Sequence, residues 1–329
     1  MYYEKLNSDE LQEIKSICDT WLFSNNIKNK NTNLLYEYCK GIDFNPVIKA
    51  FTSRLQTINW KFSKSEEVSG SICFFGGVVT SLLNYGYIKE IEGLFTFAVC
   101  YMLIDHFLDN TENTDIEKDE CIRDIYNFVV LGEKNNNKLV LAVGDRYLDL
   151  IKRVPESREY FIKLFQSEIR GVTIQRSSIF ERDVYLKIAE EKGGLTSLCI
   201  ASILGLEMDN DNNYNLGLLI QMTDDSLDIQ DDIALGIYTL ARYDIDHGNL
   251  DRYIYENIVK INNLSPVYNL FKIILLSGMI LGVHDNPNSI TDSLKDIIKE
   301  YDVYEGTSKD ELIQWFYGKL SDYINLDVE

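Results

Sequence analysis

Helical periodicity runs through almost the whole sequence and constrains the fold more than any other feature. Apolar residues recur three and four positions apart, and no run alternates apolar and polar residues as a half-buried strand does. Only four prolines interrupt 329 residues, so long stretches are free to be helical. The sequence predicts a first helix that opens at Ser8, followed by helices at about 45–58, 67–85, 88–109, 115–131, 137–153, 156–178, 181–204, 213–240, 249–262, 265–281, 289–300 and 308–325. Without a long linker or an internal repeat, we expect one all-α domain over residues 1–329.

Composition excludes a disordered chain and disfavours two classes of partner. The 21 Tyr, 15 Phe and 3 Trp supply more apolar surface than disordered chains contain. With 52 acidic and 32 basic residues, the formal charge is −20, which argues against binding to nucleic acid or to an anionic membrane. The same charge is compatible with an enzyme that binds cations.

Cysteine usage and the apolar runs indicate an intracellular protein. The six cysteines form no CxxC pair and have no clustered histidines beside them, which is typical of reduced, buried thiols. The first residues contain no apolar segment of a secretion signal, and the longest apolar run, Leu94–Ile104, is too short for a membrane span. We therefore expect a soluble, cytoplasmic protein without a membrane span, as a monomer or a homodimer.

Two carboxylates end the predicted helix at 88–109. Asp105 and Asp109 are four positions apart, so they share one face of the helix. Their mutual repulsion, and their place near the negative end of the helix dipole, each cost a few tenths to about 1 kcal/mol. Something else must compensate for this cost. A solvated helix end is the alternative interpretation.

A second acidic cluster contains five aspartates within nine residues, Asp224–Asp232. At 100° per residue, Asp224, Asp228 and Asp232 lie within an 80° stripe, and apolar residues stand between them. Oxygen-only ligands on a rigid scaffold suit Mg²⁺ or Mn²⁺ better than zinc. Two such acidic faces, opposed across a bundle, could hold a diphosphate through bound metal ions. A solvated acidic surface is the alternative here.

These clusters resemble the two metal-binding motifs of the class I isoprenoid synthase superfamily. Residues 104–109, IDHFLD, are similar to the aspartate-rich motif of microbial terpene synthases, with Ile104 in place of its first Asp. Residues 224–232, DDSLDIQDD, are similar to their second motif, and with Gln221 they fit the QxxDDxxD motif of trans-prenyl diphosphate synthases equally well. The resemblance covers roughly residues 70–240. It implies a single-domain helical bundle with a central active-site cavity.

Missing basic residues favour the terpene synthase branch. A chain-elongating prenyl synthase binds a second diphosphate through basic residues on both sides of the first motif. Here Gly76 and Gly77 precede the motif and Asn110–Asp115 follow it, without a base in either segment. Three alternatives stay open: a short-chain trans-prenyl diphosphate synthase (farnesyl or geranylgeranyl type), a catalytically silent synthase subunit, and a head-to-head synthase of the squalene type.

The resemblance also suggests which residues contact the substrate. Ala189 occupies the position of the family's diphosphate-sensing Arg, so Arg182 and Lys192, on the same helical stripe, are candidates to replace it, and Gly193 could let the helix break beside the ligand. Candidate aromatic and C-terminal wall residues are Phe97, Tyr101, Phe74, Phe75, Trp315 and Tyr323. An aromatic core and ordinary surface bases are the alternatives. His106 is expected to be structural.

Taken together, the resemblance implies an enzyme that requires Mg²⁺ or Mn²⁺ and acts on an allylic diphosphate. Three Mg²⁺ ions would be held by Asp105, Asp109, Asp224, Asp228 and Asp232. The expected reaction converts farnesyl diphosphate to a cyclic sesquiterpene or sesquiterpene alcohol and releases diphosphate.

Overall fold

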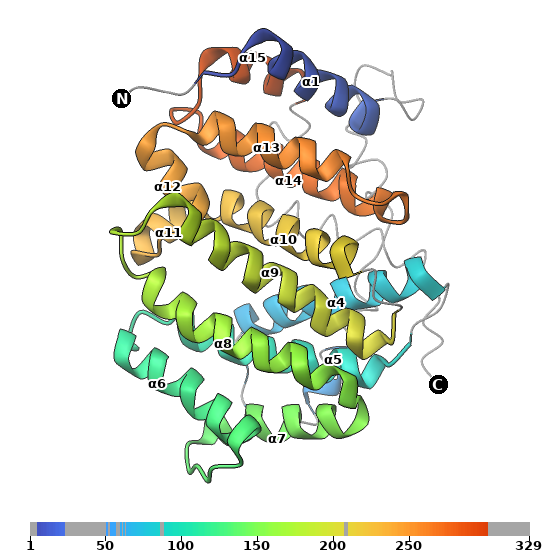
Figure 1. Cartoon of the computed structure of the whole chain (residues 1–329), viewed down its shortest axis with the longest axis vertical. Coiled ribbons are helices and arrows are strands. Elements are labelled where there is room, and N and C mark those ends of the chain that lie inside the picture. The colour runs from blue at the N-terminus through green and yellow to red at the C-terminus, as the bar shows by residue number, and fades with distance from the viewer. Residues whose placement is uncertain are drawn as a thin grey trace. The chain divides into compact units, whose positions relative to one another are not determined.

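Helices make up the regular structure of the described residues in a computed structural model of the chain. The structure describes residues 5–23, 51, 53–56, 60, 62, 64–85, 89–206 and 210–301, and none of these residues forms a β-strand. The α-helices are α1 (Ser8–Cys18), α4 (Lys64–Tyr85), α5 (Ile91–Asp109), α6 (Asp115–Tyr126), α7 (Lys138–Arg153), α8 (Arg158–Ile174), α9 (Arg182–Leu204), α10 (Asn210–Leu227), α11 (Ile229–Leu235), α12 (Leu240–His247), α13 (Leu250–Asn262), α14 (Asn269–Asp285) and α15 (Asp292–Glu300). Short π-helical turns follow α1 and α6 (Figure 1). The predicted all-α class is confirmed.

The chain divides into two compact units. Unit 1 comprises Met1–Val47, Leu219–Ala234 and Thr239–Glu329, and unit 2 comprises Ile48–Leu218 and Leu235–Tyr238. The first aspartate cluster belongs to unit 2 and the second to unit 1.

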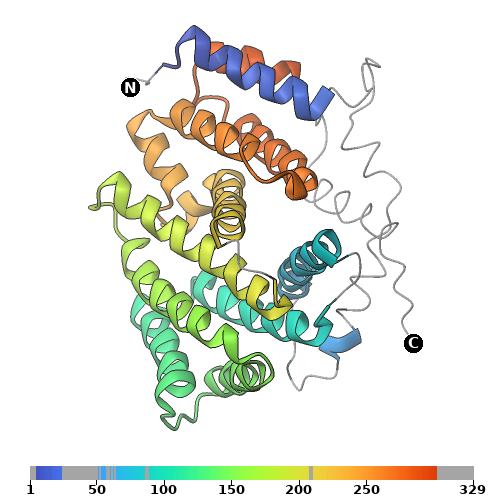
Figure 2. The same ribbon diagram turned by 45° about the vertical axis from the view of Figure 1, so that its right-hand side comes forward.

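Helix α5 forms the centre of unit 2. It packs against α4, α7 and α9, while α8 packs against both α6 and α9, as Figures 1 and 2 show from two directions. Its buried residues point in every direction around the helix axis, which explains the uniformly apolar sequence of α5. By length and composition alone, α5 is the one helix in the described part of the chain that could cross a membrane, and half of its most apolar window is buried in the fold.

Unit 1 is a layer of helices in which α1 packs on α13 and α15, and α13 packs on α12 and α14. Asn7 begins α1 with a capping box, because its side chain accepts from the backbone of Glu10 while Glu10 accepts from the backbone of Asn7. Glu10 also forms an ion pair with Arg252 of α13 at 2.6 Å, and this hydrogen bond lowers the pKa of Glu10. One residue thus starts α1 and joins it to α13.

The single helix predicted over 213–240 is wrong, because three shorter helices cover this region. The helix bends at Asp228 between α10 and α11, and α11 ends at Leu235. Gly236 follows with a φ of 69°, a left-handed conformation that terminates helices. Thr239 then caps α12 by accepting from the N–H of Arg242. The amphipathic pattern is continuous over this region, but Gly236 and Thr239 divide it into separate helices.

Several sequence predictions lie outside the described residues. They are the helix at 308–325, most of the helix at 45–58, and the candidate wall residues Trp315 and Tyr323.

Candidate active site

The first aspartate cluster lies in the last two turns of α5. Asp105 is partly buried and Asp109 is exposed, and the intact helix keeps both on one face, as their spacing predicts. His106, between them, is exposed.

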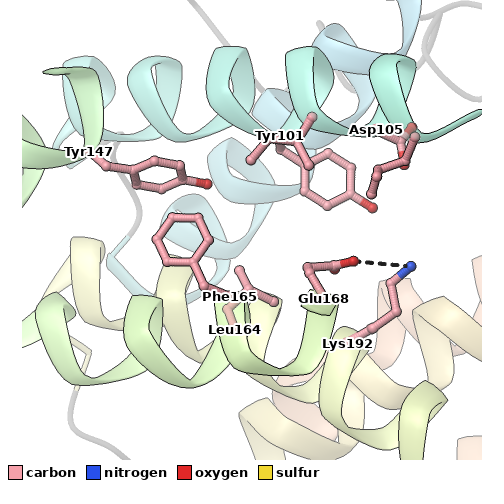
Figure 3. Close-up of a pocket in the computed structure, with 9 residues that line it drawn as sticks. Tyr101, Asp105, Tyr147, Leu164, Phe165, Glu168 and Lys192 are labelled. Atoms are coloured by element: carbon pink, nitrogen blue, oxygen red, sulfur yellow. Dashed lines mark ion pairs between the residues drawn. The ribbon is translucent and has the colours of Figure 1, made fainter. Parts of the chain in front are cut away.

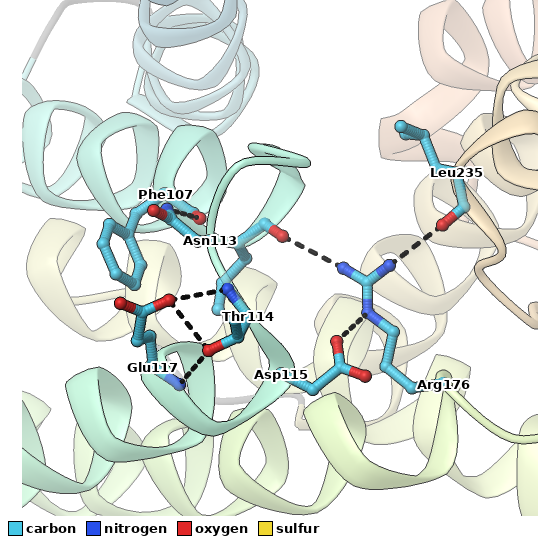
Figure 4. A network of polar contacts seen from close by, with 8 residues as sticks. Phe107, Asn113, Thr114, Asp115, Glu117, Arg176 and Leu235 are labelled. Carbon is cyan, nitrogen blue, oxygen red and sulfur yellow. Dashed lines mark hydrogen bonds and ion pairs between the residues drawn. The ribbon is translucent and has the colours of Figure 1, made fainter.

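Polar groups from neighbouring segments satisfy the backbone carbonyls at the end of α5. The N–H of Asn110 and the side-chain amide of Asn113 each donate to one of the last carbonyls. Arg176 Nη2 donates to the carbonyl oxygen of Leu108 at 3.0 Å (Figure 4). A cation at a helix C-terminus interacts favourably with the dipole, so Arg176 offsets part of the cost of placing two carboxylates there.

Asp105 faces a pocket that lies wholly within unit 2. Its walls come from α5, α7, α8 and α9, and Figure 3 shows them facing one another. The lining residues are Tyr101, Ile104, Asp105, Leu108, Tyr147, Leu164, Phe165, Glu168 and Lys192. The pocket is partly open, and its volume of about 20 Å³ is room for about one water molecule.

A partly buried ion pair lies in the lining of this pocket. Lys192 Nζ lies 3.5 Å from Glu168 Oε2, and the two side chains are 20% and 12% exposed. Lys192 Nζ also donates to Gln175 Oε1 at 3.5 Å. The candidate diphosphate base therefore lines the same pocket as Asp105, with an acidic neighbour that holds it in place.

Of the predicted aromatic residues that the structure describes, Tyr101 lines the pocket, and Phe97, Phe74 and Phe75 belong to the core. Phe97 is 1% exposed and stacks on Phe161 at a centroid distance of 5.9 Å. Phe74 and Phe75 on α4 are also buried and are not among the pocket-lining residues. Phe97, Phe74 and Phe75 are therefore packed core residues, which is the alternative that the sequence left open.

The helix does not break at Gly193, contrary to the expectation, because α9 runs without interruption from Arg182 to Leu204. A Cβ on Gly217 of α10 would lie 2.1 Å from the carbonyl oxygen of Gly193, and one on Gly194 would lie 2.3 Å from the ring of Tyr214. The small residues therefore let α10 pack closely on α9. Close helix packing therefore explains the glycines at 194 and 217, and α9 stays helical through Gly193.

Arg182, the other candidate base, is the first residue of α9 and is partly buried. It is ten residues before Lys192, or about 15 Å along the helix axis, and is not among the pocket-lining residues. Ala189 is buried. Of the two candidate bases, the pocket contains Lys192.

The second cluster keeps its helical spacing across the bend in unit 1. The N–H of Asp228 donates to Asp224 O at 2.9 Å, and the N–H of Asp232 donates to Asp228 O at 2.8 Å. Asp224 is exposed and Asp228 is partly buried, whereas Asp232 is buried and accepts from the hydroxyl of Thr239 at 3.1 Å. The predicted stripe exists, with burial increasing along it.

Packing of the opposite face of α10 explains the direction of this stripe. Thr223 and Ser226 lie against Gly278 and Gly282 of α14, where any Cβ would come within 2.7 Å of them. Asp225 is also buried, and Gln221 Nε2 donates to it at 2.8 Å. Asp225 is therefore a structural carboxylate.

Oxygen donors at both clusters suit Mg²⁺. No group of three or more His, Cys, Asp or Glu side chains within the described ranges is arranged to hold a metal ion. Mg²⁺ does not require one, because it commonly binds one or two carboxylates and takes its remaining ligands from water and substrate phosphates. The thiols offer no alternative, since burial raises the pKa of Cys73, beside Asp105, to about 12.

Sequence reasoning missed three charged residues beside the first cluster. The sequence pattern could have indicated Glu168, because it is an acid on the otherwise apolar stripe of α8 that includes Leu164 and Phe165. No sequence pattern indicated Arg176, because the helix was predicted to continue to residue 178, whereas α8 ends at Ile174. Lys118 on α6 is 3% exposed, and burial lowers its pKa while the carboxylate of Asp109 opposes that shift.

Comparisons with known proteins found similar solved structures but no similar family model or curated sequence. No protein-family model matches the sequence, and no curated protein matches it. A linalool/nerolidol synthase from Streptomyces clavuligerus is similar in structure, with a TM-score of 0.48 at 8% identity over 86% of this chain and 97% of that chain. A cucumene synthase variant gives 0.44 at 10% identity (85% and 95% covered), and a polyprenyl synthase from Caulobacter crescentus gives 0.37 at 14% (98% of both). Each of these three TM-scores is below 0.5, and none of the three identities exceeds 14%.

Proposed function

We propose that this protein is a Mg²⁺-dependent class I terpene synthase that ionises an allylic diphosphate and cyclises the resulting cation. The substrate that we propose is farnesyl diphosphate, and the product is a cyclic sesquiterpene or sesquiterpene alcohol plus diphosphate. The proposal includes a single-domain enzyme, monomeric or homodimeric, that is soluble in the cytoplasm.

One observation carries the proposal: the pocket of unit 2 is lined by Asp105 of the first motif, by Lys192 and by Tyr101. These three residues come from two helices, and the motif resemblance assigned them separately to metal, diphosphate and cation. A solvated helix end does not account for a carboxylate in a largely apolar pocket beside a partly buried ion pair.

The metal ligands that we propose are Asp105 and Asp109 of the first cluster and Asp224, Asp228 and Asp232 of the second. When bound, Mg²⁺ supplies positive charge that stabilises the departing diphosphate. Lys192 orients the diphosphate by a charge-assisted hydrogen bond, and Glu168 keeps the ammonium group in position.

The remaining pocket residues act on the hydrocarbon part of the substrate. When the allylic C–O bond breaks, its electron pair leaves with the diphosphate and a carbocation remains. The cation cyclises and then either loses a proton, which gives a hydrocarbon, or adds one water molecule and loses a proton, which gives an alcohol. The ring of Tyr101 stabilises positive charge through its face, and Leu164 and Phe165 exclude water. Because the present space admits about one water molecule, binding a C15 chain requires the pocket to widen.

The test incubates purified protein with C10, C15 and C20 allylic diphosphates and Mg²⁺, followed by analysis of volatile products. Parallel reactions contain EDTA or isopentenyl diphosphate. We expect metal-dependent release of a cyclic C15 product. A longer diphosphate formed with isopentenyl diphosphate indicates a prenyl synthase, and joining of two substrate chains without it indicates a head-to-head synthase. No turnover under any condition indicates a silent subunit.

A further inference from the structure

Arg176, in the loop between α8 and α9, joins three segments of unit 2. Its Nη2 donates to the carbonyl oxygen of Leu108 at 3.0 Å and its Nη1 to that of Leu235 at 3.2 Å. Its Nε lies 3.5 Å from Asp115 Oδ1, and its side chain is only 17% exposed. Figure 4 shows the guanidinium between these groups.

Each partner suits a cation. Leu108 is in the last turn of α5 and Leu235 is the last residue of α11, so both carbonyls lie at negative helix ends. Asp115 is in the first turn of α6. Only arginine offers several N–H donors in a planar arrangement that reaches all three acceptors, because a lysine ammonium is a single point charge.

Neighbouring contacts connect the same loop to the pocket. The N–H of Tyr238 donates to the carbonyl oxygen of Gln175 at 2.7 Å, while the Gln175 side chain accepts from Lys192. The rings of Tyr185 and Tyr238 lie 6.3 Å apart, and the hydroxyl of Tyr185 donates to the carbonyl oxygen of Ser177. The segment Leu235–Tyr238 is thereby held by its backbone and by a side chain.

We propose that Arg176 is a positioning residue of the active site. It fixes the end of α5, whose last two turns contain Asp105 and Asp109, relative to Leu235–Tyr238, the segment that follows the second aspartate cluster in the sequence. The carboxylates of α5 are then already oriented before metal binds. Metal binding therefore loses no free energy to reorienting them, and the affinity for metal is higher. This inference rests on the proposed terpene synthase function.

The first part of the test measures amide hydrogen exchange in the substrate-free protein. Arg176→Met should speed exchange about 10-fold or more at residues 106–110 and at Tyr238, with α7 unchanged. Arg170→Met is the matched control, because Arg170 is on α8, its side chain is 48% exposed, and its partner Glu191 is not a pocket-lining residue. Equal exchange at these positions in the two variants overturns the proposal.

The second part measures how turnover depends on Mg²⁺ in the full-length enzyme. Arg176→Met should raise the Mg²⁺ concentration for half-maximal turnover about 10-fold, with a smaller fall in kcat, and Arg176→Lys should recover part of the difference. A large fall in kcat with unchanged metal dependence overturns the positioning role. Absence of turnover in the unsubstituted protein refutes the proposed function instead, a result that the exchange experiment distinguishes.

Discussion

At the scale of single residues, the partly buried pair of Lys192 and Glu168 places two opposite charges in the lining of the pocket. A buried charge that loses its partner is destabilising, so neither residue can be replaced without affecting the other. The pair also brings Lys192 Nζ into the same pocket as Asp105, where a diphosphate bound through metal ions would need a donor.

Replacing Lys192 by Met should reduce turnover roughly 10- to 100-fold, because one charge-assisted hydrogen bond of about 1.5–3 kcal/mol is lost. Lys187→Met is the control, since Lys187 is 60% exposed and pairs with Glu190 and Glu191 on the surface. The double variant Glu168→Gln/Lys192→Met removes the unpaired carboxylate and should restore stability but not activity. Equal small effects of Lys192→Met and Lys187→Met on steady-state turnover would contradict the assignment.

Replacing Asp224 or Asp228 by Ala should abolish turnover while the melting temperature stays the same or rises slightly, since each change removes like-charge repulsion. Asp105→Ala should behave in the same way. Asp231→Ala is the control, because Asp231 is an exposed neighbour with no proposed ligand role. Product analysis and thermal melting measure the two effects. Full activity in Asp224→Ala and Asp228→Ala would remove the second cluster from the site, and unfolding of Asp105→Ala would make that residue structural.

At the scale of helices, local preference and tertiary contacts disagree at the end of α5. The two aspartates oppose the helix dipole, yet the helix continues through Asp109 because Asn110, Asn113 and Arg176 satisfy its last carbonyls. The compensation comes from the turn that directly follows the helix and from Arg176, which is 68 residues away in the sequence.

Close packing of α9 and α10 gives a prediction at this scale. Gly217→Ala should destabilise the fold by about 1–3 kcal/mol, because the new Cβ would lie 2.1 Å from the backbone of Gly193, which cannot move aside easily. Gly76→Ala in α4 is the matched control, since nothing lies within 4 Å of its Cβ position. There the greater helix propensity of Ala should stabilise the protein by about 0.5–1 kcal/mol. Urea unfolding measures both changes, and equal effects would contradict the packing argument.

At the scale of the whole molecule, a net charge of −20 and two acidic clusters predict a specific response to divalent cations. A ligand that binds the folded state alone stabilises it, by about 1.4 kcal/mol at a concentration about ten times its Kd. MgCl₂ should therefore raise the melting temperature more than NaCl at equal ionic strength. The excess should disappear in Asp105→Ala and in Asp224→Ala. A response identical to that of NaCl would show that the charge acts only through general screening.

The sequence by itself determined the helical class, most helix positions and the acidic faces, because these depend on apolar periodicity and on the angle between successive residues. It also identified Lys192, from its place on a helical stripe. Tertiary structure decided where helices end and which side chains pack against one another, because a periodic pattern does not contain these contacts. It ended α11 at Leu235 and α8 before Arg176, kept α9 helical through Gly193 and placed Phe97 in the core. Pairings such as Glu168 with Lys192 join residues on different helices, and such contacts depend on how those helices pack.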